Sequence, residues 1–266
     1  MHKTKPYHQY TDYDKEPAGL RKLDFVVHFL EKYFAERDKT MIKVLDVGCG
    51  RGGISIPLAS LGYHVLGIDL DVQSIESAKR KCGFKNAVFW VQDVMKLNLD
   101  EKFDCIIAFE VFEHVKEPYM VVKLLKNILA QDGILIISIP NGQSLEETIR
   151  KFTTHTNLGR KIKGFFKKRI KEEKIQTLAE SPHLHFFSLS QFKKLLSKAD
   201  LDIIAVKNTA AVFKESFYLF LRFFMRRGSR LFHFLDKMDN RLADLIPRWL
   251  GDGWMIAAKH KSKIIR

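Results

Sequence analysis

Residues 44–55 read VLDVGCGRGGIS, and this stretch decides the fold. Its apolar start predicts a buried β-strand, and the glycine-rich turn after it predicts a tight connection into a helix. Such a turn binds nucleotide-like cofactors. Gly48, Gly50 and Gly53 fit the G-x-G-x-x-G spacing of a dinucleotide site, whereas Gly48, Gly50 and Gly52 fit the G-x-G-x-G spacing of an S-adenosylmethionine (SAM) site. The glycines alone leave both cofactors open.

Strands and helices alternate on both sides of this turn. Apolar runs such as FDCIIAF and GILIISI are continuous, as expected of strands covered on both faces. This order predicts an α/β protein with a doubly wound, mainly parallel, Rossmann-like sheet. The predicted strands are 42–47, 64–69, 87–91, 103–109, 133–139, 201–208 and 253–260; the predicted helices are 19–34, 53–62, 72–82, 118–130 and 188–199.

Two stretches interrupt the alternation, at 141–181 and 211–250. Both are basic and aromatic, and we expect them to form a cap on the substrate side of one domain, residues 1–266. The cofactor-binding core is 41–140, and residues 1–40 form an N-terminal lid and helix. In the tail before that helix, Tyr7, Tyr10 and Tyr13 are candidates to close over the cofactor.

The charge of the chain is unevenly distributed. Residues 1–140 hold 19 basic and 19 acidic residues, and residues 141–266 hold 26 and 12, so the net charge of +14 comes from the second half. This excess favours an anionic partner there, although a merely soluble basic protein has the same composition. Three cysteines without framework spacing, no signal-peptide pattern and no long apolar run predict a cytoplasmic protein.

Acidic residues at the ends of the predicted strands favour SAM over a dinucleotide. Asp46 lies two residues before Gly48, where a carboxylate would repel a pyrophosphate but suits a cationic ligand. Asp69 ends the next strand and can hold ribose hydroxyls. Asp93 and Val94 follow the third strand, where they suit the adenine amino group and ring.

Residues 44–140 resemble class I SAM-dependent methyltransferases through LDVGCGRGG, Asp69, QDV and EVFEHV, which occur in the family's order. The resemblance implies a seven-stranded sheet. It places the residues of the glycine turn at the methionyl part of SAM, Asp69 at the ribose and Asp93 at the adenine. The predicted cofactor-binding residues are Asp46, Gly48, Cys49, Gly50, Asp69, Leu70, Asp93, Val94, Phe109 and Glu110.

His114 is the candidate catalytic base. Methyl transfer requires alignment of the acceptor with the sulfonium and, for an oxygen acceptor, removal of a proton. His114 lies just past the fourth predicted strand, close to the expected methyl position. A histidine there can equally be structural, with its ring bonded to the backbone.

Glu110, Glu113 and His114 form the pattern E-x-x-E-H, which suggests metal ligands. Two methyltransferase groups carry it with a bound divalent metal: the ubiquinone-pathway O-methyltransferases and the small-RNA 3′-terminal 2′-O-methyltransferases, which add a downstream histidine. His183 or His185 in SPHLHFF could supply that histidine, and a metal could lower the pKa of an acceptor hydroxyl. The pattern also occurs in related enzymes without a metal, and we expect none here.

Aromatic and basic residues in the second insertion suggest a lipid-like acceptor. A helix with Phe213, Phe217, Phe220 and Phe224 on one face, flanked by arginines, could lie in an anionic bilayer interface. It could instead cap the site or pack a dimer. The ubiquinone-pathway enzymes resemble this chain in having a membrane-touching insertion, but the stretch from LFHFLDKMDN onward departs from them, which puts a ubiquinone precursor in doubt.

Together these features predict SAM-dependent O-methylation of a small hydrophobic or lipid-linked acceptor by a cytoplasmic enzyme, with peripheral contact at the inner membrane face. A metal-dependent RNA 2′-O-methyltransferase is the alternative enzyme. A SAM-binding or membrane-binding module without catalysis is the alternative from another class, and a nicotinamide oxidoreductase is more distant. The sequence does not indicate the oligomeric state.

Overall fold

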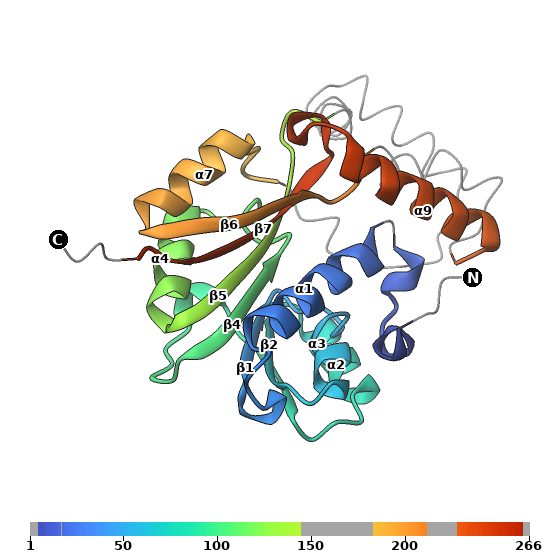
Figure 1. Ribbon diagram of the computed structural model, residues 1–266. Helices are drawn as coiled ribbons and strands as arrows, with labels where there is room; N and C mark the ends of the chain where they lie inside the picture. Colours follow the sequence, from blue (N-terminus) through green and yellow to red (C-terminus); the bar gives the residue numbers. More distant parts are fainter. Residues whose placement is uncertain (1–4, 17, 145–182, 212–227, 263–266) are drawn as a thin grey trace.

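Seven strands form one sheet in the order β3-β2-β1-β4-β5-β7-β6 (Figure 1). The computed structural model describes residues 5–16, 18–144, 183–211 and 228–262. Strands β1 to β5 run parallel, and β7 is antiparallel to both β5 and β6. The bounds are β1 Lys43–Val47, β2 His64–Asp69, β3 Ala87–Val91, β4 Phe103–Phe109, β5 Leu129–Pro140, β6 Leu201–Asn208 and β7 Gly253–His260.

The strand order creates a switch point at β1. Strand β1 pairs with β2 on one side and β4 on the other, so Val47 lies opposite both Ile68 and Ala108. The connections after β1 and β4 diverge from this point to opposite faces of the sheet. Ligands of doubly wound sheets bind in the crevice that opens there, at the carboxyl ends of the strands.

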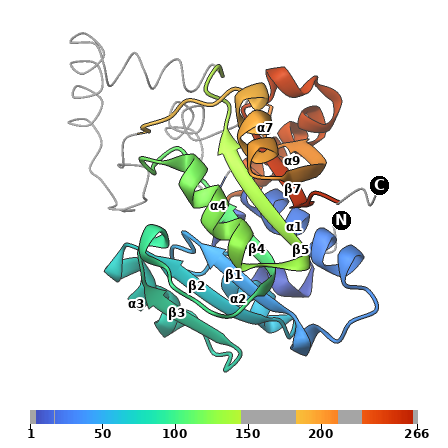
Figure 2. The same cartoon turned by 90° about the vertical axis from the view of Figure 1, so that its left-hand side faces the viewer.

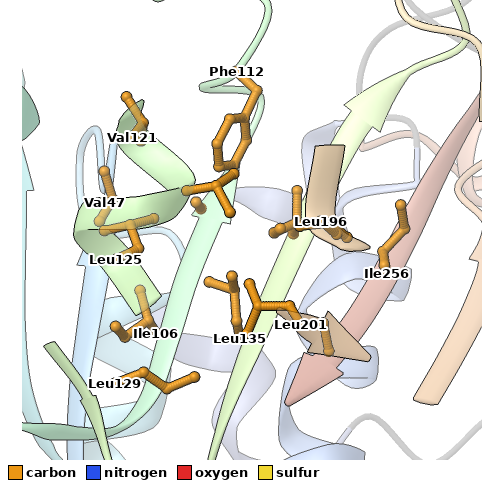
Figure 3. Packing of buried hydrophobic residues seen from close by; sticks show 14 of the residues in the cluster. Val47, Ile106, Phe112, Val121, Leu125, Leu129, Leu135, Leu196, Leu201 and Ile256 are labelled. Carbon is orange, nitrogen blue, oxygen red and sulfur yellow. The ribbon is translucent and has the colours of Figure 1, made fainter. Parts of the chain in front are cut away.

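Helices cover both faces of the sheet, which explains the continuously apolar strands (Figures 1 and 2). Helices α1 (Gly19–Tyr33), α2 (Ser55–Ser60) and α3 (Val72–Lys81) cover one face. Helices α4 (Pro118–Ile128) and α7 (Leu189–Lys198) cover the other. On that second face Val47 and Ile106 pack against Leu125 of α4, and Leu201 and Ile256 extend the same core toward α7 (Figure 3).

Helix α9 (Arg230–Leu245) lies against the beginning of α1 (Figure 1). The guanidinium of Arg21 donates to both carboxylate oxygens of Asp244, at 3.1 and 2.6 Å. The amide of Ala18 donates to Asp236 Oδ1 at 2.7 Å. Residues more than 200 positions apart in sequence therefore meet at the carboxyl-end side of the sheet.

The predicted strands are confirmed, with one boundary wrong by several residues. Strand β5 begins at Leu129 and not at 133, because Leu129 pairs with Phe103 before an irregularity in the register. Helix α4 accordingly ends at Ile128. Helix α2 begins at Ser55, two residues later than predicted, because Gly52 and Gly53 still belong to the turn.

Much of the two predicted cap insertions lies outside the described residues. This holds for 145–182 in the first insertion and for the proposed phenylalanine face of Phe213, Phe217, Phe220 and Phe224 in the second. In the part of the chain that the structure does describe, no helix combines the length and the apolar character needed to cross a bilayer.

Candidate active site

The carboxyl ends of β1, β2 and β4 bring the predicted cofactor residues together. Asp46 lies within β1, Asp69 is the last residue of β2, and Phe109 is the last residue of β4. Asp93 follows β3, whose Val91 lies opposite Asp69. Because these strands are neighbours in the sheet, side chains from four separate segments line one edge.

The left-handed glycines of the turn after β1 are the three of the G-x-G-x-G spacing. Gly48, Gly50 and Gly52 have φ of +71°, +51° and +80°, whereas Gly53 is not left-handed. A Cβ on Gly50 would have no heavy atom within 4 Å, so this residue faces open space. A Cβ on Gly52 would lie 2.8 Å from a carbon of Ile56, so that glycine serves helix packing. Gly50 is therefore the position where a ligand can approach the backbone.

Asp69 holds the turn against the end of β2. Its Oδ2 accepts from the amide of Gly50 at 2.8 Å, and its Oδ1 accepts from the amide of Asp71 at 2.9 Å. Asp71 in turn caps α3 by accepting from the amides of Gln73 and Ser74. A carboxylate has about four lone-pair sites, so Asp69 retains acceptor capacity for ribose hydroxyls.

Asp46 is a buried carboxylate next to the turn. Its Oδ2 accepts from the Ser55 hydroxyl at 2.6 Å. Burial raises the pKa of Asp46 to about 7; the nearby Asp69 charge also raises the pKa, and the hydrogen bond from Ser55 opposes the shift. A cationic ligand beside Asp46 would therefore stabilise its ionised form, which burial disfavours.

The remaining cofactor candidates occupy different environments. Leu70 is 68% exposed at the mouth of the site, whereas Cys49 and Phe109 are buried. Asp93 caps a short 3-10 helix by accepting from the amide of Met95 at 2.9 Å. Val94 is also buried and belongs to the core between β1 and α4. Asp93 is therefore more accessible to a ligand than Val94.

Glu110 has an unusual backbone conformation, and its carboxylate is hydrogen-bonded. Its φ of +53° lies in the left-handed region, which is uncommon for a side chain of this size. Its Oε1 accepts from Lys22 Nζ at 3.0 Å and from the Ser138 hydroxyl at 2.7 Å. Sequence reasoning missed Lys22, since only the docking of α1 on the sheet brings this lysine to the site.

Glu113, His114 and His183 form a cluster beside Glu110. One ligand atom from each lies within 4.8 Å of the others. The His114 and His183 rings are 4.9 Å apart in an edge-to-face arrangement. The amides of Leu184 and His185 donate to the Glu113 carbonyl, which fixes the 183–185 segment on the loop after β4.

Glu113 is fully buried, and its pKa is raised well above the usual range by burial first and by the Glu110 charge second. Its Oε1 lies 3.9 Å from His114 Nε2. One carboxylate and two imidazoles are a donor set that first-row divalent metals accept, so these three residues could hold such an ion.

The structure places the residues of the predicted metal pattern differently. Glu113 and His114 belong to the cluster, whereas the Glu110 carboxylate accepts from Lys22 and Ser138. Of the two downstream histidines His183 joins the cluster, whereas the His185 ring stacks on Phe187 and its Nε2 lies 3.3 Å from the Lys116 carbonyl.

One N-terminal tyrosine lies against the glycine turn. A Cβ on Gly53 would come within 2.4 Å of the Tyr13 ring, and the Thr11 hydroxyl donates to the Gly53 carbonyl at 2.7 Å. Tyr7 instead packs in the core, with its hydroxyl donating to Asp24, and Tyr10 packs against Phe84. In this structure Tyr13 is the tyrosine of the three that covers the site.

Comparison with known proteins identifies relatives of the whole core. The family model described as "Methyltransferase domain" matches residues 20–206. A ubiquinone biosynthesis O-methyltransferase of Glaesserella parasuis is 38% identical over 107 residues, covering 37% of this chain and 45% of the relative. A malonyl-[acyl-carrier protein] O-methyltransferase of Bacillus anthracis is 28% identical over 193 residues, covering 71% and 63%. The chain thus spans about half to two thirds of the length of these curated relatives.

Solved structures share the fold at low identity. Magnesium protoporphyrin IX methyltransferase from Synechocystis PCC 6803, with bound SAH, superposes with a TM-score of 0.55 at 19% identity and covers 91% of this chain and 84% of that one. A SAM-dependent methyltransferase from Clostridium acetobutylicum gives 0.57 at 14% identity, covering 95% and 93%. The seven-stranded sheet with its helical layers is therefore a shared architecture.

Proposed function

This chain belongs to the methyltransferase domain family, and from that premise we propose that it is a SAM-dependent methyltransferase that methylates an oxygen atom of a small hydrophobic or lipid-linked acceptor. The observation that carries this proposal is the placement of His114 beside buried Glu113, one short loop after β4 and next to Glu110. Supporting it, the two curated relatives named above are both O-methyltransferases by name.

The cofactor side of the proposal assigns a role to each part of the turn. The open face of Gly50 would receive the methionyl part of SAM, and Asp69 would accept from the ribose hydroxyls. The buried Asp46 would balance the positive charge of SAM in a medium where that charge is poorly screened. Asp93 would meet the adenine.

The transfer itself is an in-line displacement. An acceptor oxygen attacks the methyl carbon, the carbon–sulfur bond breaks, and SAM leaves as the neutral thioether SAH. His114 would take the proton from an acceptor hydroxyl as the new carbon–oxygen bond forms. Glu113 lies beneath His114 and would limit the directions in which its ring can turn.

A second candidate is a metal-dependent RNA 2′-O-methyltransferase. The cluster of Glu113, His114 and His183 favours it, as does the basic second half of the chain. The three cluster residues would hold the ion, which would supply Lewis-acid activation of a hydroxyl. Against it, Glu110 is engaged by Lys22 and Ser138 instead of joining the donor set.

Labelling separates these candidates. The purified protein is incubated with methyl-labelled SAM and a whole-cell extract, with and without EDTA, and the label is then partitioned among organic phase, soluble small molecules and RNA. We expect EDTA-resistant label in the organic phase. Label in RNA that disappears with EDTA would overturn the proposal in favour of the second candidate.

The base is tested by His114→Asn. A positioned general base contributes about 10²- to 10⁴-fold to the rate, so kcat should fall by at least about 100-fold while SAM affinity is unchanged. His185→Asn is the matched control, because His185 lies outside the cluster. Equal losses in both variants, or none in His114→Asn, would refute the base assignment.

A further inference from the structure

Helix α9 uses its three carboxylates to bind the rest of the protein. Asp236 accepts from the Ala18 amide and Asp239 from the Ala211 amide, whereas Asp244, whose side chain is 55% exposed, forms an ion pair with Arg21 at the surface. Only a few of its apolar side chains, such as Phe232 and Ala243, are buried. The usual pattern of a surface helix is the reverse, with its apolar stripe on the core and its charges outside.

The outward side of α9 is a continuous apolar stripe. Its residues recur at helical spacing, with Phe234 58% exposed and Leu245 80% exposed. Beyond the helix the stripe continues to Trp249, 71% exposed, and Leu250. We call this surface the α9 stripe; it consists of Leu231, Phe234, Met238, Leu242, Leu245, Trp249 and Leu250.

Cations border the α9 stripe. Arg230, Lys237 and Arg241 follow one edge at spacings of seven and four residues, and Arg248 lies beside Trp249. All four are exposed. Because Asp236 and Asp239 bind inward and the exposed Asp244 is ion-paired to Arg21, the exposed surface of 230–250 is dominated by apolar and basic side chains.

We propose that the α9 stripe docks on an anionic lipid surface, with its apolar residues in the interface and its cations at the headgroups. An apolar face rimmed by basic residues is the composition of helices that lie in a bilayer interface, and tryptophan is favoured at that depth. A two-fold dimer through the same stripe would bring cationic rims together, so the charge opposes a second copy.

The docking would bring the site to the membrane. The beginning of α1 joins α9 through Ala18 and Arg21, and one residue further Lys22 reaches Glu110 in the site. A lipid-linked acceptor could then enter without leaving the interface. This last step rests on the proposed function, whereas the docking itself does not.

Vesicle binding tests the inference with the full chain, without SAM or acceptor. The probes are sedimentable vesicles of phosphatidylglycerol and phosphatidylcholine in equal parts, and of phosphatidylcholine alone. We expect the protein to sediment with the anionic vesicles. The Arg230→Gln, Lys237→Gln, Arg241→Gln variant should bind them about 100-fold more weakly, since three surface cations are lost.

The apolar contribution is tested by Phe234→Gln with Met238→Gln, matched to Met41→Gln with Met120→Gln at exposed positions outside the stripe. Only the first pair should reduce binding, at unchanged circular dichroism. Absence of wild-type binding, or equal binding by both pairs, would overturn the inference. So would a lipid-free dimer, seen by light scattering, that only the Phe234/Met238 pair abolishes. If the protein binds the vesicles but the labelling experiment identifies a water-soluble acceptor, the proposed function is refuted and the docking inference stands.

Discussion

At the scale of single residues, Asp46 couples SAM binding to pH. Its carboxyl group is buried beside the glycine turn, and its pKa is raised to about 7 by that burial. A bound cation favours the ionised form, so SAM would lower this pKa and binding would release a proton. Folding stability without SAM changes with pH in the opposite direction to SAM affinity. The folded state binds this proton more tightly than the unfolded state does, so the stability that the proton contributes is lost as pH rises from about 4 to about 7.

The expected result is a pH-dependent SAM affinity. As pH falls below 7, the dissociation constant for SAM should rise by up to about tenfold per pH unit, because the Asp46 carboxyl must lose its proton before SAM binds. Above pH 7 the dissociation constant should be constant. Calorimetric titrations from pH 5.5 to 8.5 would measure this. Asp46→Asn should bind more weakly and without the slope, while Asp104→Asn, a carboxylate ion-paired to Arg37 instead, should keep it. A flat wild-type profile would contradict the role of Asp46.

Glu113→Gln separates a neutral buried acid from a metal ligand. Because burial raises the pKa of Glu113 well above its usual range, the neutral acid is favoured over the carboxylate, and an amide reproduces the shape and charge of that neutral form. We expect SAM affinity and most activity to survive, with unfolding free energy within about 1 kcal/mol of wild type. A variant that folds normally but loses both activity and a co-purifying metal would show that Glu113 is a ligand.

Sequence reasoning predicted the candidate residues at the ends of the strands, which the structure brings together, and it missed those that tertiary docking adds to them. Asp46, Asp69 and Glu110 were predictable because parallel strands bring their carboxyl ends to one edge. Lys22 was missed, since its contact with Glu110 depends on how α1 packs. His183 and His185 could not be told apart from their spacing, because the carbonyl of Glu113 fixes which ring faces His114.

At the scale of elements, the N-terminal segment lies against the turn after β1. Thr11 donates to the Gly53 carbonyl, Asp12 pairs with Lys81 of α3, and the Tyr13 ring lies on Gly53. Residues 11–13 are thus held by contacts with the glycine turn and with α3. We propose that they act as a small lid that must shift before bound SAM can exchange.

A single methyl group should open this lid. In Gly53→Ala the new Cβ would lie 2.4 Å from the Tyr13 ring, so the ring must move, whereas Gly83→Ala places its Cβ in open space. Neither glycine has positive φ, so the comparison isolates the steric effect. We expect faster proteolysis near residues 11–16 and faster SAM release in Gly53→Ala only. Identical behaviour of the two variants would show that the contact with Tyr13 has no such role.

Elements whose apolar face meets the core were predictable, and α9 was not. Leu23, Val26, Val27, Leu30 and Phe34 predicted α1, and all five are buried. Strands β6 and β7 have their predicted bounds, and each consists of an apolar run that ends in two polar residues. In 211–250 we predicted a cap insertion and a helix with Phe213, Phe217, Phe220 and Phe224 on one face, but not α9. Most apolar residues of α9 face outward, and several of its contacts with the rest of the protein are polar.

At the scale of the whole molecule, the two halves of the chain contribute different parts of the structure. The neutral first half builds the cofactor site on β1 to β4, and the basic second half contributes β6, β7 and α9. The contacts of Arg21 and Ala18 with α9 connect the halves beside the site. Composition predicted an anionic partner for the second half, but only the structure shows which described cations border an apolar surface.

The central claim is that SAM binds at the turn after β1 with its ribose on Asp69. Calorimetric titration of SAM into wild type, Asp69→Ala and Asp71→Ala tests it most directly, with folding checked by circular dichroism. Loss of two charge-assisted hydrogen bonds, each worth about 1.5–3 kcal/mol, predicts at least about 100-fold weaker binding for Asp69→Ala. Asp71→Ala loses only the cap of α3 and should bind nearly as well as wild type. Unchanged affinity in a folded Asp69→Ala would contradict the placement of SAM.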